Sequence, residues 1–231
     1  YTLLEAQINC NMTIAEEGLK NNWGANIGSV LLKEYPQGIK TEAKAWAASG
    51  SDARMSGCKL PVVILSGSGN QGITASVPVI RYAMNLGVSR EKLYRALLIS
   101  DLVTIHQKSG IGRLSAYCGA VSAGVGAGVG IAYLLDGSYD AIAHTIVNAV
   151  AIISGTICDG AKPSCAAKIA ASVDAGILGY NMYRNQQEFK GGDGIVTKGV
   201  ENTIANIGVL AQEGMRQTDR TILSIMTEKC K

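Results

Sequence analysis

The sequence lacks any cluster of charges of one sign. Its 21 basic and 18 acidic side chains are scattered along 231 residues and leave a net charge of only +3. Proteins that bind nucleic acid or an acidic membrane surface usually carry a basic patch or stripe. The charge pattern therefore favours a small-molecule partner and argues against nucleic acid and membrane partners.

Cysteine is too scarce for a disulfide scaffold, with six in the whole chain, and no signal peptide or other targeting segment opens the sequence. Both absences indicate a reducing, cytoplasmic compartment. The first residue is Tyr1 rather than Met, in a pattern typical of a helix interior, so we expect the C-terminal part of a longer protein. A chain with 47% hydrophobic residues can bury one large core or two small ones, and we take residues 1–231 as a single domain.

Strand signals are scarce as well, since only two short apolar runs have the right length, Pro61–Leu65 and Val77–Ile80. Apolar positions recur instead at three- and four-residue spacing, at residues 3–32 with a break near 21–24, at 41–48, at 90–105, and at 200–226 with breaks near Gly208 and Gly214. This pattern predicts a mainly α domain, a helical bundle with the amphipathic segments 90–105 and 200–226 at its surface.

Two long runs, 116–135 and 141–157, contain no Asp, Glu, Lys or Arg. The first is long enough to span a bilayer, but five glycines dilute its hydrophobicity and no flanking charge or aromatic belt orients it. Small residues at this density let helix backbones approach closely. We therefore expect a central pair of buried Gly/Ala-rich helices rather than a membrane span.

A Gly/Ser-rich segment, Ser66–Gly72, directly follows the apolar run 61–65. Its glycines satisfy the G-x-G-x-x-G pattern of dinucleotide-binding proteins, but that pattern needs a βαβ context and the next segment leads into helices. A turn of this composition still exposes backbone N–H groups that can hold a phosphate or a carboxylate. A helix-initiating turn without a ligand explains the same residues.

Three cysteines, Cys118, Cys158 and Cys165, lie in a neutral Gly/Ala-rich stretch, and the last two bracket a tight turn. Zinc sites usually show paired C-x-x-C or His ligands, and neither spacing is present. Iron-sulfur clusters take thiolate ligands, and a fourth position can be left to another group. Three unrelated buried cysteines remain the alternative. We assign no role to the isolated Cys10, Cys58 and Cys230.

Six motifs spread over nearly the whole chain carry a more specific signal, Ala15–Leu19, Ser51–Met55, Leu65–Ile73, Arg113–Cys118, Ile157–Ala161 and Met215–Arg220. In these motifs the sequence resembles the iron-sulfur L-serine dehydratase α-chain superfamily, most closely its branch of L-cysteine desulfidases and their uncharacterised relatives. The resemblance implies a mostly helical domain that binds a [4Fe-4S] cluster through Cys118, Cys158 and Cys165, with one iron left open for substrate.

The resemblance also implies a reaction. An open iron can act as a Lewis acid on the β-substituent of an amino acid. β-Elimination from L-cysteine then gives pyruvate, ammonia and hydrogen sulfide, with L-serine as the alternative substrate, and no pyridoxal phosphate is expected.

Site residues follow from the same resemblance and from position along the chain. The expected cradle for the substrate carboxylate is Ser66, Gly67, Ser68, Gly69, Asn70, Gln71 and Gly72. Just before Cys118, we expect His106 and Lys108 to act in acid-base catalysis and Arg113 to bind an anion. Each of these three has an ordinary alternative as a solvated or satisfied structural side chain.

One departure from the family matters. Full-length cysteine desulfidases carry a Gly-Cys-Thr-Glu-Pro motif in an N-terminal region, and nothing like it occurs in this sequence. We expect a missing N-terminal domain or a partner subunit, and a homodimer also stays open. A cluster-binding or anion-binding domain that is inactive without its N-terminal half is the alternative function. We do not expect Cys230 to serve as a fourth ligand.

Overall fold

The structure, a computed structural model, describes residues 1–112 and 115–228. Its helices are α1 (Thr2–Lys20), α2 (Ile27–Glu34), α3 (Ile39–Met55), α4 (Gly69–Leu86), α5 (Arg90–Ile111), α6 (Gly119–Leu135), α7 (Tyr139–Ile153), α8 (Cys165–Arg184), α9 (Val200–Val209), the π-helical turn η1 (Leu210–Gly214) and α10 (Arg216–Glu228). The described residues form no β-strand. The predicted mainly α fold is confirmed.

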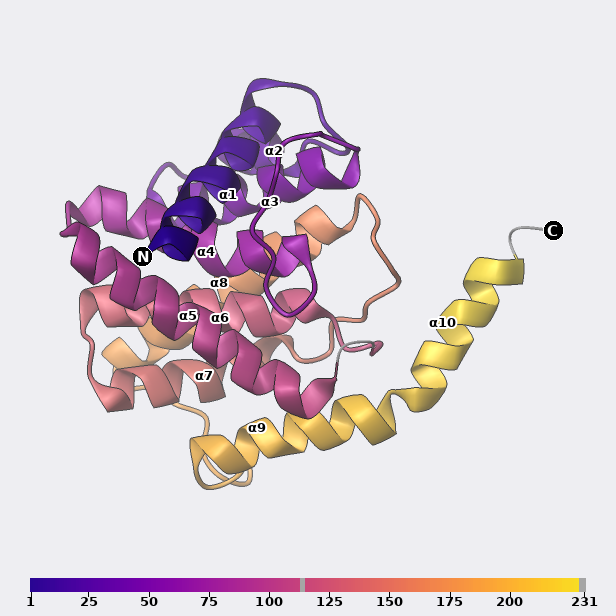
Figure 1. Ribbon diagram of the computed structural model, residues 1–231. Coiled ribbons are helices and arrows are strands. Elements are labelled where there is room, and N and C mark those ends of the chain that lie inside the picture. The colour runs from indigo at the N-terminus through magenta and orange to yellow at the C-terminus, as the bar shows by residue number, and fades with distance from the viewer. Residues whose placement is uncertain (113–114, 229–231) are drawn as a thin grey trace.

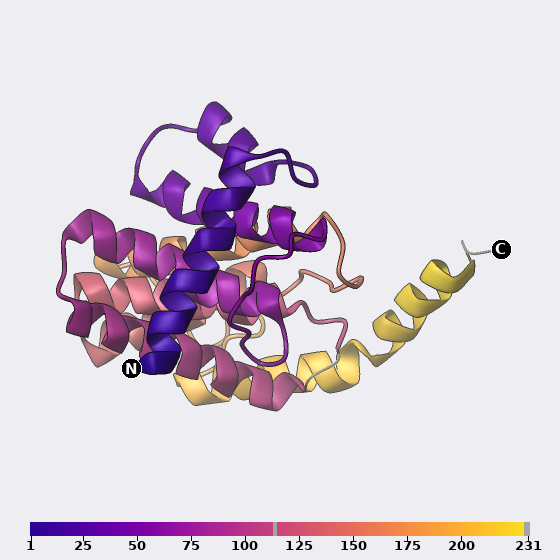
Figure 2. The same cartoon turned by 45° about the horizontal axis from the view of Figure 1, so that its top comes forward.

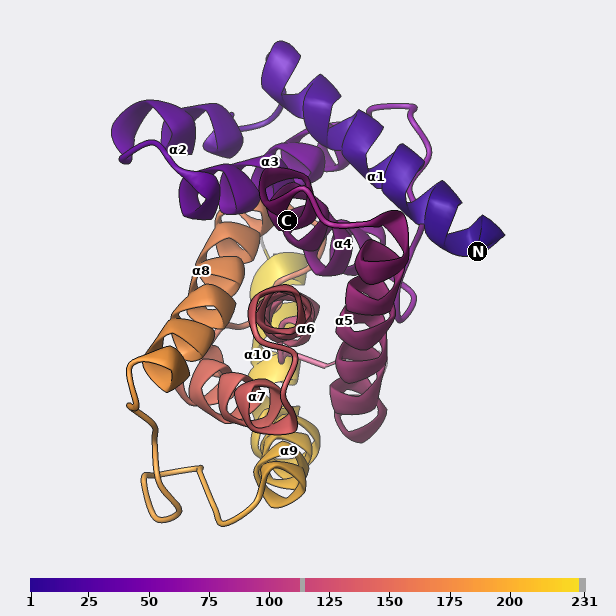
Figure 3. The same cartoon turned by 90° about the vertical axis from the view of Figure 1, so that its left-hand side faces the viewer.

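Helix α6 is the centre of the bundle. Figure 3 looks along it and shows α4, α5, α7 and α8 around it, and α6 packs against all four. Small residues make this possible, since α6 and α8 approach so closely that a Cβ on Gly176 would lie 2.3 Å from the carbonyl oxygen of Gly124. The expected pairing of the two runs is only partly right. Helix α7 buries only one face, and α6 packs closely against both α8 and α5, where a Cβ on Gly126 would lie 2.6 Å from the carbonyl oxygen of Ser100.

Two expectations about local structure were wrong. The run Val77–Ile80 lies inside α4, where all four residues are buried. A fully buried helix turn has the same apolar sequence as a buried strand, so periodicity could not separate them. Gly208 does not interrupt α9. It lies at the α5–α9 interface, where the absence of a side chain allows contact with the backbone of Gly110.

The run Pro61–Leu65 is not helical, but it pairs with no neighbouring strand. An isolated bridge between Leu65 and Ser68 closes a tight turn instead. The predicted breaks near residues 21–24 and at Gly214 are confirmed, the first between α1 and α2 and the second between η1 and α10. Helix α10 projects away from the bundle (Figures 1 and 2), and none of its described residues is buried.

No helix among the described residues is both long enough and apolar enough to cross a membrane. In α6, where the sequence run is longest, the glycines that lower hydrophobicity are the residues that admit neighbouring helices.

The ends of several helices meet on one side of α6. The N-termini of α4, α6 and α8 and the C-terminal turns of α3 and α5 all contribute residues to a single cavity. Because free backbone N–H groups give a helix N-terminus a partial positive charge, this side of the bundle suits an anionic group.

Candidate functional site

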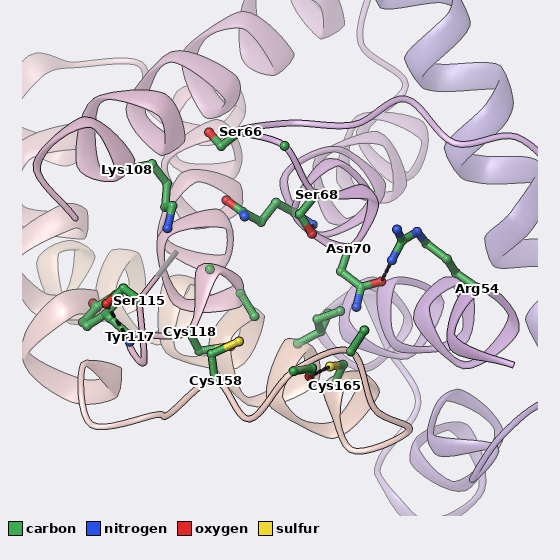
Figure 4. Close-up of a pocket in the computed structure, with 17 residues that line it drawn as sticks. Arg54, Ser66, Ser68, Asn70, Lys108, Ser115, Tyr117, Cys118, Cys158 and Cys165 are labelled. Carbon is green, nitrogen blue, oxygen red and sulfur yellow. Dashed lines mark hydrogen bonds between the residues drawn. The ribbon is translucent and has the colours of Figure 1, made fainter. Parts of the chain in front are cut away.

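The cavity has a volume of about 290 Å³ and is shown in Figure 4. Its lining contains three thiols, several hydroxyls and amides, and two basic side chains, but no carboxylate from any described residue. The lining residues are Arg54, Ser66, Gly67, Ser68, Asn70, Gln71, Lys108, Ser115, Tyr117, Cys118, Gly119, Ala120, Cys158, Gly160, Ala161, Cys165 and Ile169.

The Gly/Ser-rich segment forms one wall of the cavity. Leu65 and Ser68 exchange backbone hydrogen bonds of 3.1 and 3.0 Å, and Ser66 and Gly67 take positive φ values of 48° and 81° between them. The Ser68 side chain then caps α4 by accepting a hydrogen bond from the backbone N–H of Gln71 at 3.4 Å. The expected anion cradle is therefore the N-terminus of an 18-residue helix.

A buried asparagine fixes the extended segment that leads into this turn. The Asn11 amide donates to the carbonyl oxygen of Val63 at 3.3 Å and to the Ser76 hydroxyl at 3.0 Å, and its oxygen accepts from the Val63 N–H at 2.9 Å. A Cβ on Gly72 would lie 1.9 Å from the Val63 oxygen. The third glycine of the G-x-G-x-x-G pattern thus serves packing against this segment rather than a dinucleotide.

Cys118 and Cys158 are brought together by a short antiparallel pairing. Tyr117 and Ile157 form an isolated bridge, flanked by hydrogen bonds from the Cys118 N–H to Thr156 and from the Cys158 N–H to Ala116. Both cysteines are neighbours of the bridged pair, so their side chains share the face opposite to it. The buried Tyr117 points the other way, and its hydroxyl lies 2.9 Å from that of Ser154.

The two thiols interact directly. A hydrogen bond between them lowers the pKa of Cys158 to about 6 and, together with burial, raises the pKa of Cys118. The Lys168 ammonium, which pairs with Asp159, also lowers the pKa of both thiols. Two sulfurs that share one proton next to a cation leave one sulfur as a thiolate, the form that binds metal.

Cys165 begins α8 and lines the same cavity, but its sulfur is engaged by the preceding turn. It accepts from the Lys162 N–H and donates to the Gly160 carbonyl oxygen, both at 3.5 Å. Within the described residues, no three Cys, His, Asp or Glu side chains are arranged as a complete metal site. The structure places the three expected ligands around one cavity, and the third is turned toward its own loop.

The donor set nevertheless fits an iron-sulfur cluster. Three thiols from three separate segments, three helix N-termini and two lining cations without a lining carboxylate suit an anionic group held by thiolates. Thiolates are the ligands that such clusters require, and no histidine competes for the position.

Lys108 lies in the last turn of α5 and is only 7% exposed. Burial lowers its pKa, while Cys158 and Cys118 raise it. It forms no ion pair with a described residue, and Figure 4 shows its amine directed into the cavity above the cysteines. A buried amine without a carboxylate partner can accept a proton from a ligand.

His106, the other expected acid-base residue, is not in the cavity. Its ring is 51% exposed and pairs with Glu201 of α9 at 2.7 Å. Positions two apart on a helix face in different directions, so α5 could not present both His106 and Lys108 to one site. Arg113 lies outside the described residues.

The expected carboxylate cradle is only partly in contact with the cavity. Gly69 and Gly72 do not line it, because they pack against Arg54 and Val63 respectively. Three lining residues with polar side chains were not expected, Arg54, Ser115 and Tyr117. All three belong to motifs that carry the family resemblance, and no periodicity or spacing marks them as site residues.

The family model for the serine dehydratase alpha chain matches residues 1–224 of this sequence. The chain belongs to this family. A UPF0597 protein of Desulfitobacterium hafniense is 65% identical over 99% of this chain and 53% of its own length. A UPF0597 protein of Treponema denticola is 47% identical over 97% of this chain and 53% of its own length. UPF0597 protein YhaM of Escherichia coli is 41% identical over 100% of this chain and 54% of its own length.

No solved structure matches the chain. The chain spans about half the length of the curated relatives it matches. The resemblance to the serine dehydratase α-chain superfamily and its uncharacterised relatives is confirmed, and the sequence contains a serine dehydratase-like α-chain domain.

Proposed function

We propose that this domain forms the cluster-binding part of an iron-sulfur-dependent β-eliminating lyase that acts on L-cysteine, with L-serine as the alternative substrate. One observation carries the proposal. Cys118, Cys158 and Cys165 line the same cavity as the free N-terminus of α4 and the amine of Lys108. Ligands for a metal centre, donors for an anion and a group that can move a proton thus face one space.

The three cysteines would hold the cluster. When bound with one open coordination position, a [4Fe-4S] cluster would supply a Lewis acid for the thiol or hydroxyl leaving group. The helix N-termini of α6 and α8 begin at Gly119 and Cys165 and present partial positive charge to the cavity, which suits an anionic cluster held there.

The remaining lining residues bind and orient the amino acid. The backbone N–H groups at the start of α4 and the hydroxyls of Ser66 and Ser68 would hold its carboxylate. The Lys108 amine would remove the α-proton, since burial favours its neutral form and no carboxylate lines the described cavity around it. Loss of the β-substituent then yields aminoacrylate, which hydrolyses to pyruvate and ammonia.

A second function is favoured by one specific fact, that the chain spans about half the length of its relatives. In this alternative the domain binds the cluster and the substrate carboxylate but turns over nothing without the remaining half.

Anaerobic reconstitution with iron and sulfide tests both. We expect visible absorbance typical of a [4Fe-4S] centre that is lost in Cys158→Ala and kept in Cys10→Ala, whose thiol lies outside the cavity. Pyruvate from L-cysteine or L-serine supports the lyase, and a cluster without pyruvate supports the alternative. A protein that takes up no cluster would contradict both.

A second experiment tests the carboxylate cradle. Replacing Asn70 and Ser68 by Ala should weaken substrate affinity, because Ser68 caps α4 and Asn70 lines the cavity. Unchanged affinity in both variants would show that this wall of the cavity does not bind the substrate carboxylate.

A further inference from the structure

Arg54, in the last turn of α3, adds a positive charge to the side of the cavity that is proposed to hold the substrate carboxylate. The Gly/Ser-rich segment on that side has no charged side chain. Its guanidinium lines the cavity and donates from Nη1 to the Asn70 side-chain oxygen at 3.3 Å (Figure 4). The side chain is partly buried. An arginine fork has five N–H donors, and this contact uses only one of them.

Arg54 differs from three arginines elsewhere in the bundle. Arg81, Arg90 and Arg95 each form an ion pair with a glutamate, whereas Arg54 forms none with a described residue. Its neighbour in the cavity wall, Asn70, is neutral and leaves the positive charge uncompensated. A partly buried guanidinium without a carboxylate partner is suited to binding one from a ligand.

Gly69 explains how the guanidinium reaches the start of α4. A Cβ at this position would lie 2.3 Å from Arg54 Nε and 2.8 Å from its Cζ. Gly69 is the first residue of α4 and has no positive φ, so close packing is what requires glycine there, against Arg54 and also against Val62, whose Cγ2 would lie 2.8 Å from the Cβ. The absence of a side chain lets Arg54 lie against the helix turn whose N–H groups are free.

Arg54 and Lys108 have different places and different chemistry. Figure 4 shows them on opposite sides of the cavity, with the three cysteines along a third side. Lys108 presents a single amine next to the sulfurs, whereas the planar, always charged fork of Arg54 matches the two oxygens of a carboxylate. An α-amino acid that presents its β-substituent to the sulfurs can present its carboxylate to Arg54.

We propose that Arg54 is the residue that selects substrates with an α-carboxylate, through a bidentate contact supported by Asn70 and the N-terminus of α4. This inference rests on the proposed function for the identity of the ligand as an amino acid. It adds the residue that carries the charge and predicts that amines without a carboxylate are excluded.

The test is calorimetric titration of the protein, before and after anaerobic reconstitution, with L-serine and with ethanolamine, which lacks the carboxylate. We expect wild type to prefer L-serine, and Arg54→Gln to bind L-serine about 10- to 100-fold more weakly with no change for ethanolamine. Gly69→Ala should weaken L-serine in the same direction, because the new methyl group displaces the guanidinium. Arg95→Gln is the control, since Arg95 pairs with Glu91 on the surface.

Equal binding of L-serine by Arg54→Gln and wild type would overturn the inference, as would equal affinity of wild type for the two ligands. The inference and the proposed function can fail separately. Pyruvate formation with an unchanged KM in Arg54→Gln would refute the role of Arg54 and leave the lyase standing. Arg54-dependent binding of L-serine without pyruvate would support Arg54 and refute turnover by this chain.

Discussion

Glycine has opposite roles in the α6–α8 contact and at the rim of the cavity. In the contact, a Cβ on Gly128 would lie 2.6 Å from backbone atoms of Gly176. At the rim, no described atom lies within 4 Å of the place where a Cβ on Gly67 would be, and glycine is favoured there by a φ of 81°. One region needs glycine because two backbones touch, and the other because a turn must leave space open.

Because of this difference, substitutions in the two regions should affect different properties, stability in the helix contact and function at the cavity. The α6–α8 contact is held by many close atoms, so a change there should lower the stability of the protein. The cavity wall is held by a few hydrogen bonds from loops and helix ends, so a change there should alter binding or chemistry while the bundle stays folded.

The largest effect is expected at Lys108. Under the proposed function, Lys108→Gln should lower kcat by about 100-fold or more, because it removes the proton acceptor while keeping a side chain of similar size. Its melting temperature should not fall, since the buried amine that is removed forms no ion pair with a described residue. A pyruvate assay and a thermal melt check both. His106→Gln, two residues away on the surface, should match wild type in both measurements, and a loss of turnover there would contradict the distinction.

The next effect concerns the helix contact. Gly176→Ala places a methyl group 2.3 Å from the Gly124 carbonyl oxygen, and the overpacking should cost about 3 kcal/mol of unfolding free energy. Urea unfolding measures it. Gly155→Ala is the matched control, because its Cβ would meet no described atom within 4 Å, and it should change stability by less than about 0.5 kcal/mol. Equal stability of the two variants would show that α6 and α8 can separate without cost.

An intermediate effect is expected where the bundle supports the cavity wall. Asn11→Ala leaves the backbone of Val63 without its buried partners and should cost about 2 kcal/mol. It should also weaken L-serine binding, because the segment leading to Ser66 loses its anchor. Asn9→Ala, on the exposed side of the same helix, should do neither. If Asn11→Ala were as stable as wild type and bound L-serine with the same affinity, the conformation of the turn that follows Val63 would not depend on Asn11.

The smallest effect should have the opposite sign. Burial raises the pKa of Asp101 to about 6, against the lowering effect of the hydrogen bond from Gln7. The unfolded chain loses this proton at lower pH, so the free energy of unfolding falls as pH rises from about 4 to 6 and stays reduced above that range.

Asp101→Asn cannot ionise and keeps an oxygen that can accept from Gln7. We expect it to be about 1 kcal/mol more stable than wild type at pH 7, with the gain absent at pH 4. Urea unfolding at the two pH values is the measurement. A gain of the same size at both values would mean that ionisation is not its cause.

Much of the helical order could be predicted because apolar spacing reports which face of a helix is covered. The breaks at residues 21–24 and Gly214 were visible as polar or glycine interruptions. The helical conformation of Val77–Ile80 could not be predicted, because a helix turn buried on all sides has no apolar periodicity. Gly208 was misread as a break because a glycine that serves close packing has the same letter as one that ends a helix.

The site was predictable to a lesser degree. The sequence motifs pointed to the three cysteines and to the turn before α4, and the structure brings both to one cavity. Arg54 lies in the motif Ser51–Met55, but nothing local marked it as a site residue, since its position at the cavity depends on Gly69 and Asn70 from another helix. His106 and Lys108 looked alike in sequence, and only their directions on α5 distinguish them.

The sequence alone therefore determined the helical class, the family and the chemical types of the candidate ligands, because these depend on residue spacing and on motifs within short segments. Only the tertiary structure decided which of those residues face one another. Cys118 and Cys158 are 40 positions apart and meet through the pairing of Tyr117 with Ile157, and Arg54 reaches α4 only because Gly69 has no side chain. Contacts between distant segments depend on how the helices pack, and no local pattern records that packing.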